Sequence, residues 1–140
     1  MQNNNYADAD EKLEVFNCKN KAKIDIYVEP NYLESQSQFG NYAFSYKVYM
    51  ENVGDSMAQV IARHWIITDA HNQVHEIKGL GVVGEQPILQ IGQKYEYSST
   101  TVLPTTTGTM KGTYLCITES GDLFAADIPE FLLALPRVLH

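Results

Sequence analysis

A short stretch between Lys78 and Pro87 has the residue types and spacing with which many proteins bind phosphate groups. The residues Gly79-Leu80-Gly81-Val82-Val83-Gly84 match the pattern G-x-G-x-x-G, in which glycines let the backbone approach a pyrophosphate closely. A positive charge for such a ligand would come from Arg63 or Lys78. The candidate residues for binding a ligand or a partner are Arg63, His64, Gly79, Gly81, Gly84, Glu85 and Gln86.

The glycine pattern binds a dinucleotide only when a helix follows it, because the helix N-terminus attracts the pyrophosphate. A short strand is expected before Gly79, but Glu85-Gln86-Pro87 and the segment ILQIG leave no room for a helix. The sequence therefore predicts a structural turn, in which the glycines supply positive φ angles and both valines become buried. A functional loop stays open as the alternative, since successive N–H groups around a glycine turn can form an anion site.

Asp69, His71 and His75 lie around one expected turn, with His64 nearby in the sequence, and together they raise the question of a metal site. A zinc or cobalt site needs about four nitrogen or sulfur ligands in a tetrahedron, and no cysteine is close. Magnesium prefers an octahedron of oxygen ligands, and no paired carboxylates converge here. We therefore expect no metal or other cofactor, and a solvated hairpin whose turn Asp69 helps to form.

Hydroxyl groups are plentiful at positions 98–101 and 105–107, but their pattern does not indicate catalysis. No nucleophile elbow accompanies them, and no base follows at a matching spacing. His64, between Arg63 and Trp65 on an expected central strand, is predicted to be a hydrogen-bonded strand residue. The sequence thus predicts no catalytic residues and no enzymatic activity.

Length and charge limit the possible partners. The 140 residues predict one domain at residues 21–140, preceded by a mobile, polar and acidic leader at residues 1–20. The net charge is −7, and a chain of this sign repels nucleic-acid phosphates over a Debye length of about 8 Å. No apolar run approaches the roughly 18 residues that span a bilayer. The polar start lacks the features of a secretory signal, so a cytoplasmic location is expected.

The two cysteines are not expected to form a disulfide. The order Cys18, Trp65, Cys116 imitates the immunoglobulin core, where a tryptophan packs on an inter-sheet disulfide. However, Cys18 lies in the expected leader, and a reducing compartment opposes disulfides. We interpret Cys116 as a small, buried hydrophobic residue.

From Lys21 onward, apolar and polar residues alternate with the period of two that is typical of β-strands. One face of the first strand carries Ile24, Ile26 and Val28, and one face of the second carries Tyr42, Phe44, Tyr46, Val48 and Met50. The segment QVIARHWIITD is more continuously apolar, which predicts a central strand covered on both sides. Its two faces would be Val60, Ala62 and Ile66 against Ile61, Trp65 and Ile67. Further strands are expected in VHEI, QKYEYSSTTVL, GTMKGTYLCITE and LFAADIPEFLL.

Helix is possible only as a turn or two, near YLESQSQ and in PEFLLAL. Short strands without amphipathic helices between them predict an all-β, antiparallel sandwich or barrel. Tyr95 and Tyr97 are two residues apart and therefore share a face. They are either exposed aromatic contacts for a partner or ordinary half-buried strand residues.

Several blocks of the sequence also match a known family in their order along the chain. They are FSYKVYMENVG, RHWIITDA, GLGVVGEQPIL, YEYSS, LPTTTGTMKGTY and IPEFLLALPRVLH. From about Ile24 to His140 the chain resembles the bacterial ApaG proteins. The resemblance implies an immunoglobulin-like (fibronectin type III-like) β-sandwich without an established enzymatic activity, and a family link to cobalt and magnesium homeostasis. Related domains in larger eukaryotic proteins resemble protein-interaction modules.

Three residues depart from the family pattern. His71 and His75 stand in a hairpin where an Asn-Gly type of turn is usual, and Leu80 stands where a polar residue is common. Taken together, the sequence predicts a non-enzymatic module that binds a protein partner or associates with itself. The alternative is a weak binder of phosphate-containing small molecules, such as pyrophosphate, a nucleotide or a diadenosine polyphosphate, or of divalent cations, through the loop 79–84.

Overall fold

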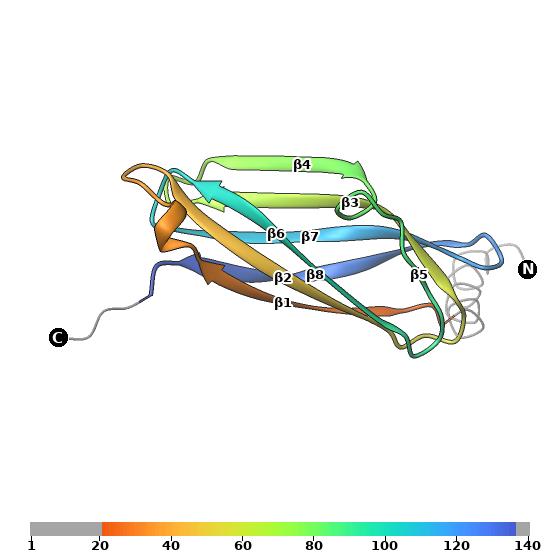
Figure 1. Ribbon diagram of the computed structural model, residues 1–140. Helices are drawn as coiled ribbons and strands as arrows, with labels where there is room; N and C mark the ends of the chain where they lie inside the picture. The colour runs from red at the N-terminus through yellow and green to blue at the C-terminus, as the bar shows by residue number, and fades with distance from the viewer. Residues whose placement is uncertain (1–20, 137–140) are drawn as a thin grey trace, which may run out of the picture.

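Two antiparallel β-sheets face each other across a hydrophobic core in the computed structural model, which describes residues 21–136 (Figure 1). The leader expected at residues 1–20, with Cys18, lies outside the described residues. The strands are β1 (Ile24–Tyr32), β2 (Tyr42–Asn52), β3 (Ala58–Asp69), β4 (Val74–Leu80), β5 (Ile88–Leu89), β6 (Lys94–Leu103), β7 (Thr107–Thr118) and β8 (Leu123–Ala134).

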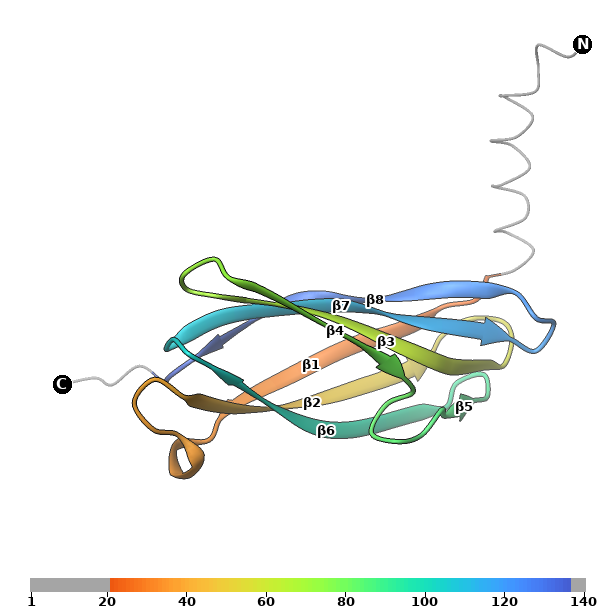
Figure 2. The same cartoon turned by 90° about the horizontal axis from the view of Figure 1, so that it is seen from above.

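One sheet has the order β1-β2-β6, and the other has the order β4-β3-β7-β8 with β5 paired to one end of β3. All strand pairs are antiparallel. The view from above shows the two sheets as stacked layers (Figure 2). The predicted antiparallel β-sandwich is confirmed. Because β4 and β6 each end the order of their sheet, each has a neighbouring strand on one side only.

Period-two alternation explains the inner faces of both sheets. In β2 the side chains of Phe44, Tyr46, Val48 and Met50 are buried, while Ser45 and Lys47 between them are not. This result confirms the face predicted for the second strand. Ile24 and Val28 of β1 are buried, and Ile26 packs against the same core. The apolar positions of a half-buried strand thus point inward because removing them from water is favourable.

Aromatic rings fill the centre of the core around Trp65. The Trp65 ring lies 5.2 Å from the Tyr46 ring, 6.0 Å from Phe131 and 6.3 Å from Tyr114, measured between centroids. All three contacts are edge-to-face, the arrangement that the ring quadrupole favours. The three partner rings come from β2, β8 and β7, so Trp65 joins both sheets.

A β-bulge corrects the faces predicted for β3. Val60 pairs with Cys116 and Ala62 with Leu115, so Ile61 is an extra residue without a partner of its own on β7. The bulge shifts the alternation by one residue. Val60 therefore lies in the core together with Trp65, and not on the opposite face as predicted. The other face of β3 is only half-buried, which also corrects the expectation of a strand covered on both sides.

The two possible helical turns have different outcomes. Near YLESQSQ a single turn of 3-10 helix forms at Glu34–Gln36, as expected. The segment PEFLLAL is not helical, because Pro129 and the residues up to Ala134 belong to β8. Pro129 and Glu130 lie opposite the single residue Lys111, at a shift in the pairing of β7 and β8. A bulge tolerates a proline, which cannot donate a hydrogen bond to the neighbouring strand. In residues 21–136, no helix has the length and apolar character needed to cross a membrane.

Candidate functional site

The stretch that matches G-x-G-x-x-G forms the end of β4 and a tight hairpin turn. The N–H of Val82 donates to Glu85 O at 2.7 Å, and the N–H of Glu85 donates to Val82 O at 3.0 Å. Between them, Val83 has a φ of 48° and Gly84 has a φ of 80°. Positive φ at both central positions identifies a type I′ turn. The chain then enters β5, not a helix, as the sequence predicted.

The two valines of the turn differ, although both were expected to be buried. Val82 is fully buried, whereas the side chain of Val83 is 61% exposed. The prediction is wrong for Val83 because it occupies the tip of the turn. Its β-branched side chain is also disfavoured at positive φ, where Cβ crowds the backbone. The turn therefore holds a strained residue at an exposed position.

Gly81 and Gly84 have the positive φ angles that were predicted, at 65° and 80°. At Gly81 a Cβ would also lie 2.3 Å from Glu85 O, so the turn closes only around glycine. Gly79 has a different role, because its φ lies outside the left-handed region. It pairs with Arg63 of β3, and a Cβ there would lie 2.8 Å from the guanidinium Nη2.

The guanidinium of Arg63 therefore occupies the space that Gly79 leaves empty. Arg63 Nη1 donates to Leu80 O at 2.9 Å and to Gly81 O at 3.0 Å. These carbonyl groups belong to the segment that leaves β4 and enters the turn. Since Arg63 lies on β3, its side chain ties the start of the loop to the centre of the sheet.

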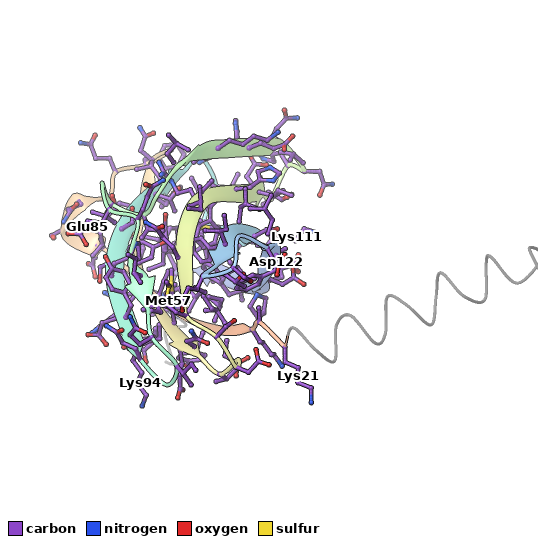
Figure 3. All side chains as sticks on the ribbon, turned by 90° about the vertical axis from the view of Figure 1, so that its right-hand side faces the viewer. Lys21, Met57, Glu85, Lys94, Lys111 and Asp122 are labelled. Carbon is purple, nitrogen blue, oxygen red and sulfur yellow. The ribbon has the colours of Figure 1, made fainter. Side chains whose placement is uncertain are left out.

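Glu85 and Gln86 also hold the loop in place. The hydroxyl of Tyr95, on β6, donates to Glu85 Oε1 at 3.1 Å, which links the loop to the other sheet. Glu85 is labelled in Figure 3. Gln86 Nε2 donates to Ile61 O at 2.9 Å. Ile61 is the bulged residue of β3, so Gln86 satisfies a carbonyl next to the irregular pairing.

Hydrogen bonds within the protein already use several donors of the loop. The N–H of Gly81 donates to Ile61 O at 2.6 Å, and those of Val82 and Glu85 donate to each other's carbonyl groups. An anion site needs neighbouring N–H groups that point outward together. These three donors point to protein acceptors, and the loop is braced on both sheets. Its geometry is that of a tight hairpin turn held by side chains from both sheets.

His64 lies elsewhere, on the outer face of the five-stranded sheet, in the row next to Ala62. A hollow of about 490 Å³ lies on this face. One row of paired residues crosses four strands at its floor and walls: Leu80 beside Ala62, Ala62 beside Leu115, and Leu115 beside Ala125. We call these four residues the outer row.

The next row across the same face is polar. His64 lies between Lys78 and Thr113, and these three residues also line the hollow. His64 Nε2 lies 2.7 Å from Glu76 Oε1, at hydrogen-bond distance. The hydrogen-bonded role predicted for His64 is confirmed. The hollow thus has an apolar side, where Leu80 is 75% exposed, and a polar side formed by His64, Lys78 and Thr113.

The structure brings Arg63, Gly79 and Gly81 into contact, and it places His64 on the opposite face of β3 from Arg63. None of the four members of the outer row, namely Leu80, Ala62, Leu115 and Ala125, was among the candidate residues. In the sequence, alternation offers a signal for them, because Leu115 stands between the inward-facing Tyr114 and Cys116. The signal is weak, because an isolated exposed leucine is common on protein surfaces.

Tyr95 and Tyr97 share a face as predicted, and that face is directed toward the core. Their rings are 6.4 Å apart, and the Tyr97 hydroxyl is hydrogen-bonded to the hydroxyl of Tyr114. Burial raises the pKa of Tyr97 to about 12 and raises the pKa of Tyr114 further. These are half-buried strand residues. Cys116 is fully buried, as predicted, and this burial raises the pKa of its thiol to about 12.

The turn role predicted for Asp69 is confirmed. Its Oδ1 accepts the N–H of His71 at 2.8 Å and the N–H of Gln73 at 3.0 Å. A carboxylate that accepts both hydrogen bonds stabilises the reversal between β3 and β4. The side chains of His71 and His75 are exposed. Within residues 21–136, no group of three or more His, Cys, Asp or Glu side chains is arranged to hold a metal ion.

Comparison with known proteins supports the resemblance noted in the sequence. A family model described as the ApaG domain matches residues 32–118. The chain is similar to the protein ApaG of Dechloromonas aromatica, with 49% identity over 123 residues, which cover 86% of this chain and 97% of the relative. It is 52% identical to the protein ApaG of Thiobacillus denitrificans over 122 residues, with coverage of 86% and 96%.

Two solved structures have the same architecture. A crystal structure of a Bordetella pertussis protein superposes with a TM-score of 0.81 at 49% identity, covering 84% of this chain and 97% of that chain. An X-ray structure of a structural genomics target superposes with a TM-score of 0.79 at 44% identity, covering 84% and 91%. At these identities, both sequence and fold relate the chain to those proteins.

Proposed function

The chain belongs to the ApaG family, and on that premise we propose that it is a non-enzymatic module that docks a protein partner on the outer face of its five-stranded sheet. The observation that carries this proposal is the outer row, an apolar strip over a hollow of about 490 Å³. Exposed apolar surface with a polar rim is typical of protein-interaction sites. We further propose a cytoplasmic location for this activity.

The hollow has the form that a partner's apolar side chain would fill. Ala62 and Ala125 have short side chains and leave depth, while Leu80 and Leu115 stand beside them. Leu115 is 41% exposed, and Leu123, two residues before Ala125 on β8, extends the apolar surface. Filling such a pocket with an anchor residue contributes most to binding when the surrounding rim excludes water. His64, Lys78 and Thr113 would supply that polar rim.

A photo-crosslinking residue placed at Leu115 tests the proposal in cells. We expect a specific crosslinked protein from position 115, and none of that kind from the control position Val102. Val102 is 57% exposed on β6 of the other sheet, so it is at least as accessible as Leu115, which is 41% exposed. The purified partner is then expected to bind Leu115→Asp at least tenfold more weakly than wild type, and Val102→Asp equally well. Equal binding by Leu115→Asp would refute docking at this face.

In this proposal the glycine loop is a structural hairpin, because N–H groups of the loop donate to acceptors within the protein and side chains from both sheets hold it. A thermal-shift measurement with pyrophosphate, ATP, diadenosine tetraphosphate and Co²⁺ is therefore expected to give no stabilisation. Any ligand that binds the folded state raises its melting temperature by mass action. A saturable shift that disappears in Arg63→Ala would instead favour the binding of phosphate-containing small molecules.

A further inference from the structure

Strand β4 is an open edge of the five-stranded sheet. It is hydrogen-bonded to β3 on one side, and in Figure 1 it forms the upper border of the molecule. The residues of β4 are exposed except for Gly79, which is half-buried. An edge of this kind offers a row of backbone donors and acceptors to another strand.

The phase of the hydrogen bonds shows which residues of β4 face the open edge. At one end the N–H of Gly81 donates to Ile61 O, and at the other the N–H of Asp69 donates to Gln73 O. Odd-numbered residues of this segment therefore direct their backbone groups toward β3. Because the direction alternates along an antiparallel strand, Val74, Glu76, Lys78 and Leu80 direct theirs outward.

The sequence of β4 is Val-His-Glu-Ile-Lys-Gly-Leu, with Ile77 at its centre. An acidic and a basic residue flank Ile77, and an apolar residue stands at each end, so two antiparallel copies of this strand would place complementary side chains opposite each other. We propose that two copies of the chain pair through β4 about a two-fold axis at Ile77. In this register Glu76 lies opposite the second copy's Lys78, and Val74 lies opposite the second copy's Leu80. Ile77 meets its own counterpart. The outward-facing residues then form about eight hydrogen bonds between the two strands.

Charge selects this register over its neighbours. Moving the axis to Glu76 places two glutamates opposite each other, and moving it to Lys78 places two lysines opposite each other. Like charges directly across a strand pair are destabilising, whereas opposite charges are favourable. A shift by one residue would bring outward-facing residues opposite inward-facing ones and lose the hydrogen bonds. With the axis at Ile77, the outward-facing backbone groups form hydrogen bonds and opposite charges face each other.

The side chains at the edge are available for these contacts. Lys78 has no acidic side chain within ion-pair distance in the described part of the chain. Glu76 is held by His64 through Oε1, which leaves Oε2 to receive a lysine from the second copy. Val74 is 57% exposed and Ile77 is 43% exposed, so pairing would remove apolar surface from water.

The geometry defines a closed dimer, because each copy uses its β4 edge once. The resulting sheet runs continuously through both copies. One seven-residue strand pair buries less than the roughly 800 Å² per partner of a standard interface, so we expect a dissociation constant on the order of micromolar. This inference does not rest on the docking proposal, since its hydrogen bonds come from the β4 backbone, although Lys78 and Leu80 also line the hollow.

Reversal of the charges tests the register, with sedimentation velocity over a concentration series as the measurement. The single variants Glu76→Lys and Lys78→Glu each place like charges opposite each other twice, so we expect association to weaken about tenfold or more. The double variant Glu76→Lys/Lys78→Glu restores opposite charges and is expected to form dimers again. An equimolar mixture of the two single variants is expected to form a heterodimer.

Controls separate this register from a general effect of charge. Glu96→Lys, on β6 of the other sheet, changes the net charge as much as Glu76→Lys does and is expected to leave the dimer intact. Circular dichroism and thermal unfolding verify that each variant is folded. A wild-type chain that stays monomeric at every concentration overturns the proposal, and so do single variants that dimerise like wild type. Failure of the double variant and of the mixture to dimerise also overturns it.

Discussion

Replacement of Val83 by asparagine is expected to stabilise the protein, although it removes an apolar side chain. Val83 is the first central residue of a type I′ turn and has a φ of 48°. A residue with a Cβ loses about 1–2 kcal/mol in this region, while asparagine is adapted to it, and Asn-Gly is a preferred pair for this turn. Gly84 already supplies the glycine.

The magnitude follows from the exposure of the side chain. Burying a valine completely contributes about 1.5 kcal/mol or more, but Val83 remains 61% exposed, so its loss costs roughly 0.5–1 kcal/mol. Relief of the backbone strain at positive φ exceeds that cost, so the free energy of unfolding is expected to increase by about 0.5–1 kcal/mol. For a domain near this size, such a gain raises the melting temperature by about 1–4 °C.

Urea unfolding followed by the fluorescence of the single tryptophan, Trp65, measures the free energy of unfolding. Val83→Ala is the matched control, because it loses the same apolar contacts but keeps a Cβ at a positive φ without the adaptability of asparagine. We expect Val83→Asn to be more stable than wild type and Val83→Ala to be no more stable than wild type. If Val83→Asn is equally stable or less stable, backbone strain at this turn is not the dominant effect.

Three further results are expected. Gly112→Ala lowers the free energy of unfolding by a few kcal/mol, measurable by urea denaturation, because a Cβ would lie 2.1 Å from His64 O and force β3 and β7 apart. Stability decreases as the pH rises from 10 to about 12, because the folded state keeps Tyr97 protonated while the unfolded state releases its proton near 10.0; circular dichroism should show a smaller decrease in Tyr97→Phe. The thiol of Cys116 reacts with a thiol reagent at pH 8 only after unfolding, as mass spectrometry of the labelled peptide would verify, and rapid labelling in the native state would contradict its burial.

The sequence predicted the fold class well because alternation reports burial directly. In β2, Phe44, Val48 and Met50 face the core as expected, since a strand has no other way to bury one side. The absence of a helix after Gly84 was also visible, because too few residues separate that glycine from the next turn. Alternation and the spacing of glycines therefore predicted the structure wherever it depended on residues close together in the chain.

Local rules failed where a second strand decided the outcome. The sequence of β3 does not reveal that Ile61 bulges, since the bulge exists only in its pairing with β7, and it moves Val60 to the core. Gly79 looked like a turn glycine, yet its role is to admit the guanidinium of Arg63 from the neighbouring strand. Pro129 suggested a helix start, but pairing with β7 made it part of a bulged strand.

The sequence by itself determined that the chain forms an all-β domain, with a glycine-dependent turn after the fourth strand and buried aromatic residues at its centre. Only the tertiary structure decided which strands lie side by side. That arrangement gathered Leu80, Ala62, Leu115 and Ala125 from four strands into one row, and it left the edge of β4 open. The physical reason is that periodicity acts within a few residues, whereas strand register is set by hydrogen bonds between segments far apart in the chain.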